Sequence, residues 1–94
     1  MNTWSDLNRQ ADIYKSSYPE GTRVILEHMN DSLHPIEPGT RGTVDIVDDI
    51  GQIHIRWDNG RFLAVIPGED SFRKLTEAEL AEEAQGQPLT EPKM

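Results

Sequence analysis

Few side chains in this sequence could bind a metal. His28, His34 and His54 could do so together with Asp31 or Asp58, because imidazole and carboxylate groups are common metal ligands. No two of these residues have the close spacing of a ligand pair, and the chain contains no cysteine. We therefore expect neither a metal site nor any other cofactor.

Clustered carboxylates are the other feature that could support catalysis. Asp45, Asp48 and Asp49 could hold a cation or act as an acid–base pair, but such a cluster before Gly51 is more typical of a solvated turn. The sequence lacks the glycine-flanked serine of a nucleophile elbow, and so small a domain is not expected to contain a deep pocket. We therefore do not expect an enzyme.

Aromatic and basic side chains beside turns are better candidates for binding. Trp57 precedes the polar turn Asp58-Asn59-Gly60 and could form a shelf for a ligand. Alternatively, Trp57 packs in the core and the polar residues only make the turn. The candidate binding residues are Tyr18, Arg41, Arg56, Trp57, Asp58, Asn59, Arg61 and Phe62.

Glycines mark the predicted bends of the chain. A phosphate loop would require a strand–glycine–helix pattern with Lys-Ser or Lys-Thr, which is missing, so we assign the glycines to bends. Asn59-Gly60 predicts a type I′ hairpin turn, because that turn needs positive φ at both central residues. The predicted structural turns contain Gly39, Gly42, Gly51, Gly60 and Gly68.

Two helices are predicted at the ends of the chain. Apolar residues at helical spacing predict the first helix over residues 3–16. Thr76 and Glu79 have the pattern of a capping box, which predicts a second helix over residues 76–85 that ends before Gly86. We expect a disordered acidic tail after it.

Five runs of β-forming residues lie between these helices. Period-two alternation places Val24 and Leu26 on one side of the first strand, and Val44 and Ile46 on one side of the second. The predicted strands cover residues 23–29, 42–47, 52–57, 61–66 and 71–75. We expect a binding cleft between the long loop at 30–39 and the turns at 48–51 and 57–60.

These elements predict a mainly β protein. The expected architecture is a small SH3-like five-stranded barrel with a short N-terminal helix and a C-terminal helix. We expect residues 1–17 to form an N-terminal helical extension, residues 18–75 the barrel domain, and residues 76–94 the C-terminal helix and tail.

The net charge of −8 bears on possible partners. An acidic chain is repelled by phosphate backbones, so we do not expect direct binding to nucleic acid. The N-terminal residues lack the basic and apolar regions of a signal peptide, and no apolar run is long enough to cross a membrane. We expect a cytoplasmic protein without membrane contact.

Between Tyr18 and Leu75 the chain carries several short motifs. They are Tyr18 to Val24, Pro38 to Val44, Asp48 to Gly51, Trp57 to Gly60, Ile66 to Gly68 and Phe72 to Leu75. In this order they resemble the DUF4314 family, uncharacterised SH3-like domains of bacteria, phages and mobile elements. Two of the pieces are also similar to SH3-like modules of Mind-bomb and HERC-type ubiquitin ligases. The resemblance implies a phage or mobile-element context and no established activity.

We expect a non-enzymatic module that binds another protein. It would be an accessory or host-modulating protein of a phage or mobile element, and one form of this role is anti-defence. One alternative is an oligomeric sponge that binds a small ligand such as a nucleotide signal through Arg41, Arg56, Arg61 or Arg73. Another alternative is an acidic mimic of nucleic acid that inhibits a DNA-binding protein. A homo-oligomer is compatible with these hypotheses.

Overall fold

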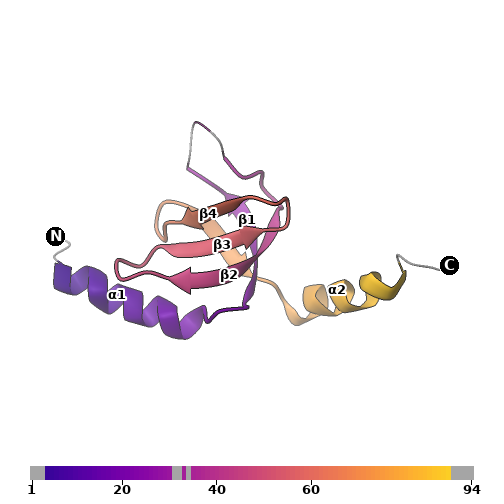
Figure 1. Cartoon of the computed structure of the whole chain (residues 1–94), viewed down its shortest axis with the longest axis horizontal. Coiled ribbons are helices and arrows are strands. Elements are labelled where there is room, and N and C mark those ends of the chain that lie inside the picture. The colour runs from indigo at the N-terminus through magenta and orange to yellow at the C-terminus, as the bar shows by residue number, and fades with distance from the viewer. Residues whose placement is uncertain (1–3, 31–32, 34, 90–94) are drawn as a thin grey trace.

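The computed structural model describes residues 4–30, 33 and 35–89. Within them, two helices flank five strands (Figure 1). In chain order the elements are α1 Trp4–Ser17, β1 Arg23–His28, β2 Arg41–Val47, β3 Ile53–Trp57, β4 Phe62–Val65, β5 Ser71–Lys74 and α2 Glu77–Leu89. Asp31 and His34, two of the possible metal ligands named above, lie outside the described residues, as does the chain after residue 89.

The strands form one antiparallel sheet in the order β4-β3-β2-β1-β5. The first four strands follow one another as a meander, and β5 returns to pair with the free side of β1. Because β4 and β5 remain the two edges, the hydrogen-bonded sheet is not closed. The predicted mainly β fold with a helix at each end is confirmed, and the sheet is an open one.

The core lies on one face of this sheet. Val24 and Leu26 of β1 are buried there together with Ile53, Ile55 and Trp57 of β3, as period-two alternation predicts. Other buried members of the same cluster are Met29, Ile36, Val44, Val47 and Val65. Burial of these apolar side chains is the main force that holds the sheet in its curved shape.

A β-bulge in β2 changes which side chains reach the core. Val44 pairs with Ile55, and Ile46 pairs with the adjacent residue His54. Asp45 is therefore the extra residue of the bulge and has no partner in β3. As a result Val44 and Val47 point inward, whereas Ile46 is 59% exposed. The prediction that Val44 and Ile46 share the core face is therefore wrong, because alternation fails across a bulge.

Two of the predicted glycine roles also differ from the structure. Gly60 N donates to Trp57 O at 2.9 Å, which makes Asp58 and Asn59 the central pair of the turn and puts Gly60 after it with φ +93°. The type I′ turn centred on Asn59-Gly60 is thus wrong, although the hairpin itself is present. Gly42 lies inside β2 and not in a turn, because the side chain of Trp57 packs directly over it.

Helix α1 packs against the turn between β2 and β3. Ala11 is buried, and a Cβ atom on Gly51 would lie 3.8 Å from the Ala11 nitrogen, so helix and turn approach closely. At the end of α1, the rings of Tyr18 and Phe72 are 5.6 Å apart, centroid to centroid. These contacts place α1 along one end of the sheet (Figure 1).

Helix α2 projects from the opposite end of the molecule (Figure 1). The capping box is confirmed, since Thr76 N donates to Glu79 Oε1 at 2.8 Å and Glu79 N donates to Thr76 Oγ1 at 3.1 Å. The helix continues to Leu89, past the predicted end before Gly86, because a glycine costs a helix only about 1 kcal/mol. Neither helix in the described residues has the length and hydropathy that a membrane-spanning helix needs.

Candidate functional site

The two turns of the predicted cleft lie far apart. The turn at 48–51 precedes β3 and the turn at 57–60 follows it, so they stand at opposite ends of that five-residue strand. The loop at 30–39 contacts the second turn, where Arg61 Nη1 donates to Pro35 O at 3.2 Å. A single cleft bounded by all three segments, as predicted, is therefore wrong.

Three of the candidate binding residues already make contacts within the protein. Trp57 is 3% exposed, and its Nε1 donates to Leu63 O at 3.0 Å, so its ring belongs to the core. Both carboxylate oxygens of Asp58 accept hydrogen bonds from Arg23, at 2.8 and 2.6 Å. Asn59 Oδ1 accepts a hydrogen bond from Arg61 N at 3.0 Å and orders the turn.

The other candidates are spread over the sheet. Tyr18 is half-buried next to Lys74, whose Nζ lies 5.1 Å from its ring centroid, and burial raises the pKa of the Tyr18 hydroxyl. Arg56 and Phe62 are cross-strand partners, and Phe62 is 59% exposed. Arg41 forms an ion pair with Glu83 at 3.2 Å. The sequence-based candidates thus form no single site.

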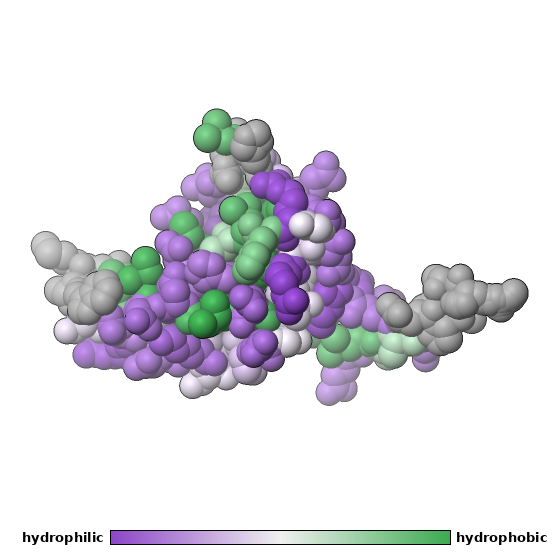
Figure 2. Space-filling model, viewed as in Figure 1, coloured by the Kyte–Doolittle hydropathy of each residue, from purple (hydrophilic) through white to green (hydrophobic). Residues whose placement is uncertain are grey.

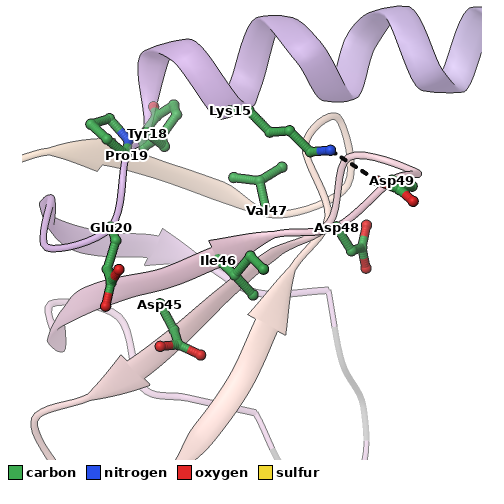
Figure 3. Close-up of a pocket in the computed structure, with 9 residues that line it drawn as sticks. All are labelled: Lys15, Tyr18, Pro19, Glu20, Asp45, Ile46, Val47, Asp48 and Asp49. Carbon is green, nitrogen blue, oxygen red and sulfur yellow. Dashed lines mark hydrogen bonds and ion pairs between the residues drawn. The ribbon is translucent and has the colours of Figure 1, made fainter.

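An open groove of about 630 Å³ lies between α1 and β2 (Figure 3). Its floor is apolar and includes Ile46 and Val47, with Tyr18 and Pro19 at the end of α1. Ile46 is the exposed isoleucine that the bulge turns outward. Apolar residues elsewhere on the face shown in Figure 2 form small separate areas within a hydrophilic surface.

Carboxylates dominate the rim of the groove. Lys15 is its one basic residue and forms an ion pair with Asp49 at 2.8 Å, which raises the pKa of Lys15. Burial alone would raise the pKa of Asp48, but hydrogen bonds from His54 and from two backbone amides lower it overall. The groove therefore has a negative field around an apolar floor.

Two rim carboxylates have no bonding partner among the residues that the structure describes. The side chains of Glu20 and Asp45 make neither an ion pair nor a hydrogen bond within the described part of the chain. Ile46 follows Asp45 in the bulge and lies between Glu20 and Asp48 in the view of Figure 3. These groups are free to contact a ligand that carries positive charge beside an apolar group.

Sequence analysis missed Lys15, Glu20 and Ile46 as members of one surface. A local signal was present, because the adjacent apolar pair Ile46-Val47 interrupts the alternation of β2, and such an interruption is typical of a bulge. The approach of α1 to β2 had no comparable signal, since it depends on contacts between distant parts of the chain.

Comparison with known proteins assigns the chain to a family without a known activity. No curated protein matches it. The family model for a domain of unknown function, DUF4314, matches residues 8–75, which include the whole sheet and every residue that lines the groove. The match begins within α1, earlier than the stretch from Tyr18 to Leu75 that carries the motifs. The chain belongs to the DUF4314 family.

Proposed function

We propose that this protein is a non-enzymatic module that binds another protein through the groove between α1 and β2. The observation that supports this proposal is the 59% exposure of Ile46 in a groove whose rim carries Glu20 and Asp45, two carboxylates with no partner among the described residues. An apolar groove floor with a rim of polar side chains is typical of an interaction surface.

The charge of the groove indicates the chemistry of its partner. Four carboxylates and one ammonium group line it, so a segment with lysine or arginine next to an aliphatic residue would be complementary. Full burial of an isoleucine contributes about 1.5 to 3 kcal/mol. The opposite charges would speed association and select the partner, and the aliphatic contact would supply most of the affinity.

Two further parts of the proposal depend on the sequence resemblance. A meander of four strands with β5 returning to β1 fits the SH3-like connectivity that the motifs imply. We also keep the inference that the protein is an accessory factor of a phage or mobile element. The nucleotide-sponge alternative gains no support here, since Arg41 and Arg73 already pair with carboxylates of α2.

Selection from a library of random peptides tests this function. Full-length protein is the bait, and an Ile46→Ser variant measures dependence on the groove. Phe62→Ser is the matched control, because Phe62 is also 59% exposed but does not line the groove. We expect selected peptides to combine lysine or arginine with an aliphatic residue, and Ile46→Ser to weaken their binding about tenfold.

Three results would count against the proposal. One is a selection that enriches no sequence, and another is the enrichment of acidic peptides. The third is binding that Ile46→Ser leaves unchanged while Phe62→Ser reduces it, because this would move the site to β4.

A further inference from the structure

Four arginines share the outer face of the sheet, which is the face turned away from the core. Arg23 pairs with Thr43, and Thr43 with Arg56, so these residues form one cross-strand row. In the neighbouring row, Ile25 of β1 pairs with Arg73 on one side and with Arg41 on the other. We call Arg23, Arg41 and Arg73 the arginine face, because each of them contacts α2.

Three glutamates of α2 occupy the arginine face, with Glu82 in the longest contact, 3.7 Å from Arg41. Glu83 accepts hydrogen bonds from Arg23 Nε at 3.1 Å and Nη2 at 2.6 Å, and from Arg41 Nη1 at 3.2 Å. Glu79 accepts two hydrogen bonds from Arg73, at 2.8 and 2.9 Å. Glu79 and Glu83 are four residues apart and therefore project from the same side of the helix.

Helix α2 attaches through these carboxylates and not through an apolar stripe. In residues 77–85, Glu79 and Glu83 are the only half-buried side chains, and the others, including Leu80 at 41%, are exposed. A surface helix normally turns apolar residues toward the body of its protein. These ion pairs lie near the surface, where salt screens them, so the attachment of α2 is sensitive to ionic strength.

We propose that the arginine face is a binding surface for an acidic helix of another protein, and that α2 is its intramolecular occupant. The helix now bound there shows which ligand geometry fits, namely carboxylates one helical turn apart. This surface is distinct from the groove of the proposed function and belongs to different residues.

Nucleic acid is a poorer fit to the same surface. Asp58 lies within it and accepts two hydrogen bonds from Arg23, so an incoming phosphate would meet a carboxylate. The net charge of −8 also repels a phosphate chain at long range. A helix with a few well-placed carboxylates avoids most of this repulsion, because its other side chains can be neutral.

Full-length variants test the proposal with a labelled peptide of residues 76–89 as the probe. In the freed variant, Glu79→Gln with Glu83→Gln removes the two α2 carboxylates that hydrogen-bond to the arginine face, and glutamine at position 79 can still complete the capping box. Glu69→Gln with Glu77→Gln is the control, because it removes the same charge from side chains without an ion pair in the described residues. Fluorescence polarisation at low salt measures the affinity.

We expect the freed variant to bind the peptide about tenfold more tightly than the wild type or the control, because it lacks the tethered competitor. Adding Arg41→Gln to the freed variant should weaken binding again, and high salt should abolish it. Equal affinity for wild type, control and freed variant would overturn the proposal. Tighter binding of single-stranded DNA than of the peptide would replace the acidic helix with nucleic acid.

Hydrogen exchange on the wild type decides the question if the freed variant fails to fold. Excess peptide should displace α2 and speed amide exchange in residues 77–85, while exchange in β3 stays unchanged. Unchanged exchange in 77–85 at a peptide concentration that saturates binding would overturn the proposal.

Discussion

At the scale of single residues, Gly42 shows how closely the sheet packs on its core. A Cβ atom at this position would lie 2.6 Å from Ile55 Cγ2 and 2.8 Å from Trp57 Cε3. Neither side chain can move away easily, because both are buried among other core residues. The glycine is therefore required by close packing and not by a turn.

Substitution of this glycine should destabilise the fold. We expect Gly42→Ala to lower the free energy of unfolding by about 1 to 3 kcal/mol, since overpacking forces core side chains out of their preferred rotamers. Gly60→Ala is the control, with φ +93° but open space around the new methyl group. We expect Gly60→Ala to lower the free energy of unfolding by only about 1 kcal/mol, from backbone strain alone.

Urea unfolding of both variants measures the difference. A Gly42→Ala variant as stable as the wild type would contradict the packing described for Trp57. A larger loss for Gly60→Ala would show that strain in the turn outweighs packing in the core.

At the scale of elements, the sequence predicted the positions of the strands better than the register between strands and the packing of α1 on them. Alternating residues such as Ile53, Ile55 and Trp57 identify β3 and its buried face, because burial on one side imposes a period of two. The bulge at Asp45 and the turn before Gly60 depend on register between strands, which short-range patterns specify only weakly. The groove was missed because it also requires the approach of α1 to β2, which depends on contacts between distant parts of the chain.

Helix α2 differs from α1 in how it is attached. Helix α1 buries Ala11 and packs Tyr14 against the core, whereas α2 contacts the sheet through Glu79 and Glu83. The hydrogen bonds from Arg73 and from the Thr76 amide lower the pKa of Glu79 from 4.5 to about 2. The hydrogen bonds from Arg23 likewise lower the pKa of Glu83.

Acid should therefore loosen α2. A carboxylate with a lowered pKa in the folded state stabilises that state above its ordinary pKa of 4.5, and the contribution is lost as the pH falls through about 2. We expect amide NMR signals of residues 77–85 to shift between these pH values before those of β3 change. With Arg73→Gln, the shift should occur at a higher pH.

The same titration can fail in two informative ways. Signals of 77–85 that change only together with β3 would show that α2 unfolds with the sheet. An Arg73→Gln titration that matches the wild type would show that the Arg73 guanidinium does not hold the Glu79 carboxylate in solution.

At the scale of the whole molecule, two surfaces with different charge patterns lie beside α1 and α2, toward opposite ends (Figure 1). The groove beside α1 carries two carboxylates, Glu20 and Asp45, that have no partner among the described residues, and the arginine face beside α2 carries arginines that acidic residues already occupy. The net charge predicted only repulsion of nucleic acid. It could not predict the two surfaces, because a sum over the chain does not show where the charges lie in the fold. Folding separates them, and this separation is consistent with the proposed binding module.

The most direct test of this account is an amide NMR titration of the full-length protein with a peptide from the library selection. We predict the largest shifts at Lys15, Glu20, Asp45 and Ile46, with none of that size in β4. The Ile46→Ser variant should keep a folded spectrum and show much smaller shifts at the same peptide concentration, because its binding is about tenfold weaker. Shifts centred on Phe62, or shifts that keep their full size in Ile46→Ser, would contradict the claim that the groove between α1 and β2 is the binding site.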